Sequence, residues 1–83
     1  MFKYSISVPL DKVQENDYIT WAVAFEKDGK ELYRKDADKE EIIKVQKNGI
    51  LSRDFKTTII PNLWIIWPYS QSKGWCERIT GKI

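Results

Sequence analysis

The most hydrophobic stretch of the chain runs from Thr57 to Tyr69, and we expect the other elements to pack around it. Two apolar runs, Ile59–Ile60 and Leu63–Trp67, flank Pro61–Asn62, a pair that suits the centre of a β-turn because proline presets φ. The pattern predicts two strands that meet at a tight bend. Because both faces of the second strand are apolar, we expect another layer to cover each face.

Alternating apolar and polar residues predict two strands in the N-terminal half. In Phe2–Val8 every second residue is apolar, which is typical of a strand with one buried face. Tyr18–Phe25 resumes this period, with the larger apolar side chains on one face and two alanines, Ala22 and Ala24, on the other. Side chains this small would let another layer, which we expect to be a helix, approach closely.

The pair Asp28–Gly29 predicts a hairpin after the second strand. Asp-Gly between two strand patterns supplies the positive φ that a tight hairpin turn requires. Two registers remain open at this point. A two-residue loop would place Phe25 opposite Leu32, whereas a three-residue loop with a bulge would place Glu26 opposite Lys30 and pair their charges.

A short helix is predicted for Asp38–Lys47. Asp38 and Glu41 have the spacing of a capping box, and Asn48–Gly49 offers a left-handed position at which a helix can end. Lysines lie toward the C-terminal end of the segment, where they complement the helix dipole. The apolar stripe of the segment is narrow, so we interpret the helix as a cover for the sheet and not as a binding element.

The rest of the chain predicts further strands. Ile50–Ile60 begins and ends with apolar residues, and its Phe55 is expected in the core. Ser70–Gly74 has the composition of a loop, and Trp75–Thr80 alternates as a final strand. The order of elements predicts one α+β, mainly β, domain over residues 1–83. Its five or six strands would form a largely antiparallel sheet or a small OB-like barrel, with one short helix between the third and fourth strands.

Length and cysteine content narrow the class of protein. A chain of 83 residues has one core and little stability to spare, so pairing with itself or with a partner would help. Cys76 is the only cysteine, which excludes an intrachain disulfide and favours a reducing, cytoplasmic compartment. No signal-peptide pattern is visible, and the apolar runs are shorter than the ~20 residues that span a bilayer, so no membrane partner is expected.

The residue types leave little room for catalysis. The chain has no histidine, and so it lacks the usual general base near neutral pH and the commonest metal ligand. It also lacks the glycine-rich motifs that cradle phosphates. We interpret Cys76 as a small core residue of the last strand, and the acidic residues near Asp38 as helix-capping groups. We therefore expect no enzymatic activity, no metal and no cofactor.

The net positive charge and three of the four tryptophans lie in the C-terminal half. Residues 1–41 hold 7 Lys or Arg against 10 Asp or Glu, whereas residues 42–83 hold 7 against 2. Strand alternation sends Trp64 and Trp67 to opposite faces, so either a helix covers the second face or aromatic rings are exposed there. The alternative is that most of these rings fill the core. The candidate binding residues are Trp64, Trp67, Tyr69, Trp75, Arg53, Lys56, Lys73 and Arg78.

Two functions fit this set of residues. The first is docking on a protein partner, as an inhibitor, adaptor or accessory subunit, or self-association into a homo-oligomer, because Trp, Tyr and Arg dominate interface energetics. The second is binding of single-stranded nucleic acid or a nucleotide-like ligand, with bases stacked on the rings and phosphates at the cations. The net charge of +2 is small for a nucleic-acid-binding protein. Tyr69 and Trp75 flank the predicted loop, and we expect them to be the most accessible of the rings.

Overall fold

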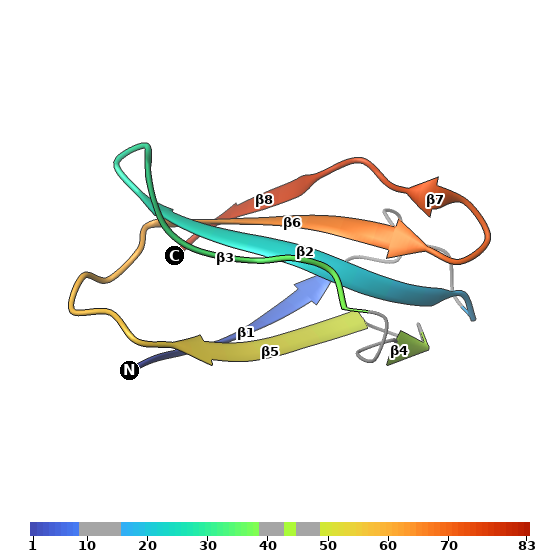
Figure 1. The fold of residues 1–83 in the computed structure, drawn as a ribbon, viewed down its shortest axis with the longest axis horizontal. Coiled ribbons are helices and arrows are strands. Elements are labelled where there is room, and N and C mark those ends of the chain that lie inside the picture. The colour runs from blue at the N-terminus through green and yellow to red at the C-terminus, as the bar shows by residue number, and fades with distance from the viewer. Residues whose placement is uncertain (9–15, 39–42, 45–48) are drawn as a thin grey trace.

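The protein is all-β in the computed structural model, which describes residues 1–8, 16–38, 43–44 and 49–83 (Figure 1). β1 and β5 form a two-stranded sheet, and the other strands form a larger sheet in the order β3-β2-β6-β7, with β4 on β2 and β8 on β6. Every pairing between these strands is antiparallel. The strands are β1 (Phe2–Val8), β2 (Tyr18–Lys27), β3 (Lys30–Lys35), β4 (Ile43–Lys44), β5 (Gly49–Phe55), β6 (Leu63–Ser70), β7 (Gly74–Trp75) and β8 (Ile79–Lys82).

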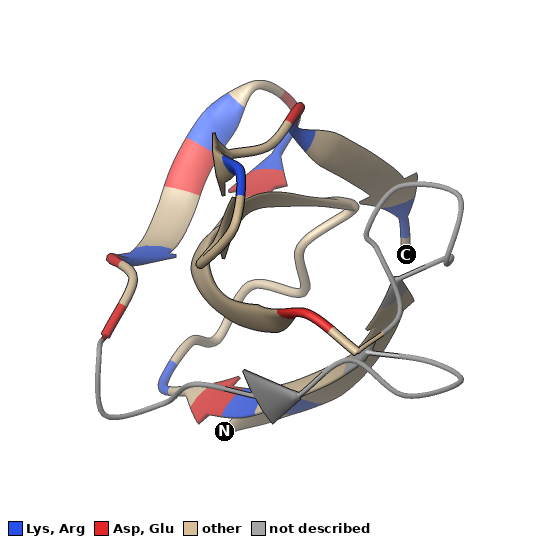
Figure 2. Ribbon diagram, turned by 90° about the vertical axis from the view of Figure 1, so that its right-hand side faces the viewer, with Lys and Arg blue, Asp and Glu red and all other residues tan. Residues whose placement is uncertain are grey.

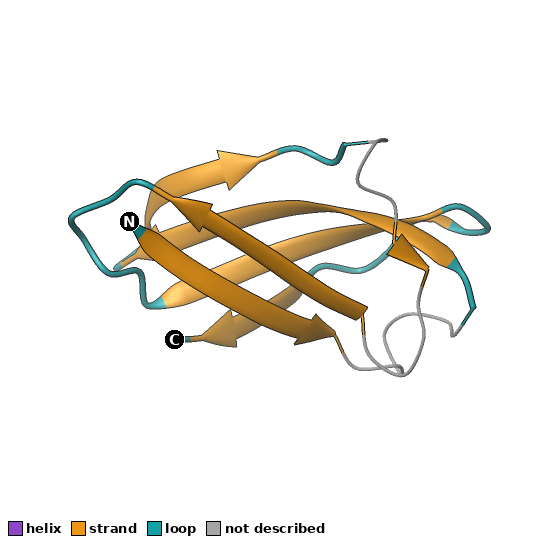
Figure 3. Cartoon of the chain, turned by 90° about the horizontal axis from the view of Figure 1, so that it is seen from below, coloured by secondary structure: helices purple, strands orange, loops and turns teal. Residues whose placement is uncertain are grey.

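The core lies between the two sheets. Figure 3 shows β1 and β5 as a layer in front of the larger sheet, with their strands crossing the strands behind at an angle. The predicted alternation of β1 is confirmed up to Ser7, because Ile6 is buried while Lys3, Ser5 and Ser7 are exposed. The predicted burial of Phe55 is also confirmed. The buried core residues in contact are Ile6, Ile19, Trp21, Val23, Phe25, Leu51, Phe55 and Ile66.

The predicted β2–β3 hairpin is confirmed, and of the two loop lengths that the sequence left open it has the two-residue loop. Asp28 and Gly29 both have positive φ, at 50° and 84°, as this type of hairpin turn requires. Both predicted registers are wrong. Glu26 pairs with Glu31 and not with Lys30, and Phe25 pairs with Tyr33 and not with Leu32, because Leu32 is the extra residue of a bulge. The bulge brings Tyr33 onto the core side, where its ring stacks on the ring of Phe55 at the end of β5.

The predicted helix Asp38–Lys47 is wrong, and with it the α+β class. Ile43–Lys44 form strand β4, which pairs with Tyr18–Ile19 at the start of β2. β3 covers β2 only from Val23 onward, so the start of that edge would otherwise be unpaired. A β-branched isoleucine also favours a strand over a helix. Residues 39–42 and 45–48, which include Glu41 of the predicted capping box, lie outside the described residues. No helix long and apolar enough to cross a membrane occurs in the part of the chain that the structure describes.

The predicted OB-like barrel and single sheet are also wrong, since the strands divide between two sheets. The predicted strand at Ile59–Ile60 is a loop instead. This loop, residues 56–62, carries the chain from β5 in one sheet to β6 in the other, and both isoleucines are exposed. The Thr57 hydroxyl accepts a hydrogen bond from the N–H of Ile59 at 3.1 Å, which holds the loop locally.

Asp17 fastens the turn between β6 and β7 to the start of β2. Its carboxylate accepts hydrogen bonds from the Ser70 hydroxyl, from the Ser72 hydroxyl at 2.7 Å, and from the N–H of Tyr18 at 2.8 Å. The Ser70 hydroxyl in turn accepts a bond from the N–H of Lys73 at 3.1 Å. The Ser70 hydroxyl, followed by that of Ser72, holds the pKa of Asp17 below its ordinary value of 3.8.

Gly81 of β8 pairs with Trp64 of β6, and the indole ring lies over the glycine. A Cβ atom added at Gly81 would overlap this ring, although the backbone of Gly81 does not have positive φ. We therefore expect Gly81→Ala to lower the free energy of unfolding by about 1–3 kcal/mol, measured by urea denaturation. In a Trp64→Ala background the same change should be neutral or slightly stabilising, because alanine restricts the unfolded chain. An equal loss of unfolding free energy in both backgrounds would show that overlap with the Trp64 ring is not the cause.

A lowered pKa at Asp17 makes stability depend on pH. Because the folded protein favours the ionised carboxylate, its contribution is complete above pH 3.8 and is lost as the pH falls below that value. We expect Asp17→Asn to unfold at lower urea concentration at neutral pH, and the difference from the wild type to shrink on acidification below 3.8. Ser72→Ala, which removes one donor, should show part of the effect. A constant difference in stability between wild type and Asp17→Asn, from neutral pH to below 3.8, would contradict the prediction.

Candidate functional site

The outer face of the larger sheet, which points away from the core, carries small residues on its central strand. β2 presents Thr20, Ala22 and Ala24 there, and the expected helical cover does not exist among the described residues. Large side chains of β6 flank these positions across the strand pair. The facing pairs are Thr20 with Tyr69, Ala22 with Trp67, and Ala24 with Ile65. Small residues in the middle and large ones beside them leave the outer face hollowed.

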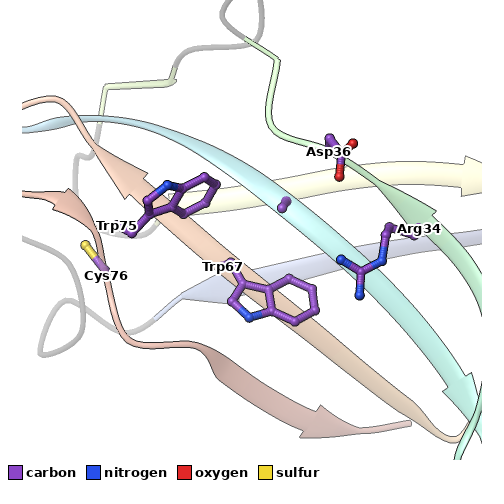
Figure 4. Close-up of a pocket in the computed structure, with 6 residues that line it drawn as sticks. Arg34, Asp36, Trp67, Trp75 and Cys76 are labelled. Atoms are coloured by element: carbon purple, nitrogen blue, oxygen red, sulfur yellow. The ribbon is translucent and has the colours of Figure 1, made fainter.

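Two hollows lie on this face, and together we call them the aromatic groove. The first has a volume of about 360 Å³ and the second about 230 Å³. Figure 4 shows Arg34 and Asp36 on one side of the first hollow, Trp75 and Cys76 on the other, and Trp67 between them. Trp75 lines both hollows, and the residues that line the second are Thr20, Ala37, Tyr69 and Trp75.

Trp75 and Tyr69 are the accessible rings of the aromatic groove. Trp75 is 61% exposed and Tyr69 is 42% exposed, as predicted from their positions beside the loop. They are cross-strand partners, and their rings meet edge to face with 5.1 Å between centroids. The Trp75 indole therefore packs on a neighbouring ring although most of its surface faces solvent.

Charged residues of β3 and the segment after it form the opposite wall. The guanidinium carbon of Arg34 lies 5.0 Å from the ring centroid of Trp67, within the range of a cation–π contact. Arg34 also makes an ion pair with Glu31, with 2.8 Å between Nε and Oε1. Asp36 makes no hydrogen bond or ion pair with any residue that the structure describes. The Thr20 hydroxyl donates to the carbonyl of Asp38 at 2.9 Å, which ties this segment to β2.

Proline in β6 explains why the predicted last strand, Trp75–Thr80, is divided into β7 and β8. The carbonyl of Pro68 accepts a hydrogen bond from the N–H of Cys76 at 2.8 Å, so this backbone edge of Pro68 faces the 76–78 segment. A residue's N–H and C=O point to the same neighbour in an antiparallel pair, and proline has no N–H to donate there. The ladder is interrupted at this point, and Cys76 lines the first hollow of the groove, half-buried and not in the core.

The predicted binding residues separate into two groups. Trp67, Tyr69 and Trp75 meet in the aromatic groove. Trp64 lies on the opposite face of β6, as alternation predicts, and packs against the core. Arg53 is half-buried on β5 in the other sheet. Three cations are exposed and do not line the groove: Lys56, Lys73 and Arg78.

Two residues that line the groove, Arg34 and Asp36, were not among the binding residues predicted from the sequence. Arg34 and Asp36 lie in the acidic half of the chain, where no aromatic run drew attention to them. A hairpin without a bulge would also have placed Arg34 on the core side of the sheet. The bulge pairs Arg34 with Ala24 and so brings it to the outer face. Figure 2 shows Lys and Arg close to Asp and Glu in this part of the chain. β3 itself carries three cations and one carboxylate, and Asp36 and Asp38 follow it, so residues 30–38 hold equal numbers of the two signs.

Metal binding has no support in the described residues, which contain no group of three or more Cys, Asp or Glu placed to hold an ion. The aromatic groove offers stacking surfaces, one cation and one carboxylate. No family model, no curated protein and no solved structure matches the chain. The geometry of the aromatic groove is therefore the basis for assigning a function.

Proposed function

We propose that this is a non-enzymatic binding protein that holds a segment of a partner protein in its aromatic groove. The observation that carries the proposal is the position of Trp75, which is 61% exposed, lines both hollows and packs edge to face on Tyr69. An exposed indole that already packs on a neighbouring ring loses less conformational entropy when a partner buries it than an indole without such a contact. Tryptophan at such positions is enriched among the residues that dominate binding energy.

The shape of the groove supports a chain segment as the occupant. Two hollows on either side of one tryptophan suit two successive anchoring side chains of a partner better than one compact ligand. The floor is made of small residues of β2, Ala22 and Thr20, so a partner could approach the sheet closely. Arg34 at the rim is another residue type that is common in protein interfaces.

Single-stranded nucleic acid is the weaker alternative. Trp75 and Tyr69 could stack on bases. Among the described residues, however, Arg34 is the one cation that lines the groove, and it already pairs with Glu31. The carboxylate of Asp36 lies in the same hollow and would repel phosphates. The predicted cations Lys56, Lys73 and Arg78 lie elsewhere on the surface.

Selection from a displayed library of random peptides tests the proposal and requires no identified partner. Peptides selected on the wild-type protein should bind Trp75→Ala at least about tenfold more weakly by calorimetry, the loss expected for a central interface tryptophan. Ile60→Ala is the matched control, because Ile60 is 69% exposed in the 56–62 loop and does not line the groove. Far-ultraviolet circular dichroism should show that both variants keep the fold.

Three outcomes separate the candidate occupants. Equal binding of selected peptides by wild type and Trp75→Ala would remove the aromatic groove as the docking site. A concentration-dependent dimer that Trp75→Ala abolishes, measured by sedimentation, would identify a second copy of the chain as the partner. Quenching of tryptophan fluorescence by oligonucleotides that weakens with salt would favour nucleic acid instead.

A further inference from the structure

The first hollow of the aromatic groove contains one carboxylate whose charge is not balanced within the described residues. Arg34 and Asp36 both line it, and their formal charges are opposite. The charge of Arg34, however, is engaged by Glu31 at 2.8 Å. Asp36 has no such partner in the described ranges. An occupant that supplied a positive charge near Asp36 would complete this arrangement.

The indole rings of the hollow are suited to the same kind of group. The face of an indole attracts cations through its quadrupole, most strongly when water is partly excluded. Within the chain this attraction is already used once, because the guanidinium of Arg34 lies 5.0 Å from the Trp67 ring centroid. Trp75 lines the same hollow across from Asp36 (Figure 4), and most of its surface is available.

We propose that the first hollow of the aromatic groove binds an arginine side chain of the partner segment, with its guanidinium at Asp36 and its plane against Trp75. This inference rests on the proposed function and specifies the residue that the groove recognises. Arginine fits better than lysine because a planar guanidinium can stack on an indole and donate two parallel hydrogen bonds to a carboxylate. Ala22, which lines the floor, is small enough to leave room for the side chain.

Capped amino acids test the site directly. Nα-acetyl-arginine-amide would be titrated into ¹⁵N-labelled protein at millimolar concentration, with the indole N–H signals of Trp75 and Trp67 as the readout. We expect saturable shifts of both signals. Nα-acetyl-citrulline-amide, a neutral analogue of the same shape, should bind about fivefold more weakly or not at all, and the lysine probe should lie between the two.

Variants assign the charge requirement to Asp36. Asp36→Asn should abolish the preference for the arginine probe over the citrulline probe, while Asp54→Asn, at an exposed carboxylate on β5, should preserve it. Glu31→Gln should weaken binding of the arginine probe. Without its ion-pair partner, Arg34 would repel the positive charge of the probe in the same hollow. Equal binding of the arginine and citrulline probes, or an equal effect of the Asp36 and Asp54 substitutions, would overturn the inference.

The failure of this inference differs from a failure of the proposed function. If selected peptides depend on Trp75 but contain no arginine and do not respond to Asp36→Asn, the groove docks protein segments and the arginine site is wrong. If no peptide depends on Trp75 and yet the arginine probe shifts its indole signal in an Asp36-dependent manner, the guanidinium site exists and peptide docking is wrong. Tighter binding of the Nα-acetyl-glutamate-amide probe would exclude the cation site.

Discussion

The pairing of β2 with β6 is the constraint on which the rest of the structure depends. It joins eight consecutive pairs, from Ile19 with Ser70 to Glu26 with Leu63, at the centre of the larger sheet. Alternation then assigns one face of both strands to the core and the other to the aromatic groove. A slip of one residue would move Ala22 to the core side and Val23 to the groove side. Core packing therefore also fixes which residues face the groove.

The sequence predicted the elements whose signals are local. Alternation located β1 and β2, and the Asp28–Gly29 pair located the hairpin turn, because each signal depends on a few adjacent residues. The helix prediction failed for a non-local reason. The capping pattern that begins at Asp38 was consistent along the chain, but pairing at the uncovered edge of β2 was decided by where β3 ends. The sequence of Asp38–Lys47 does not show that an unpaired edge of β2 lies beside it.

The residues of the candidate site likewise include some that local signals predicted and some that they did not. Trp67, Tyr69 and Trp75 were identified because strand alternation and a loop composition are visible in the sequence. The position of Arg34 on the outer face was not predicted, because it depends on the bulge at Leu32, which changes the face of every later residue of β3. The predicted cluster of cations did not form at the groove, because nearness in sequence to an aromatic residue does not place two side chains on one face. The count of Lys and Arg in the C-terminal half was therefore a poor guide to the charge of the site.

The missing N–H of Pro68 has a consequence for the edge of the sheet that carries Trp75. It separates β7, which has only two pairs with β6, from β8, which has four. Trp75 therefore lies on a strand that is held by two pairs with β6 and by the hydrogen bonds of Asp17 to the preceding turn, separately from the β6–β8 ladder. Displacement of Trp75 would then disturb two backbone pairs at the margin of the sheet and leave the register of the core unchanged.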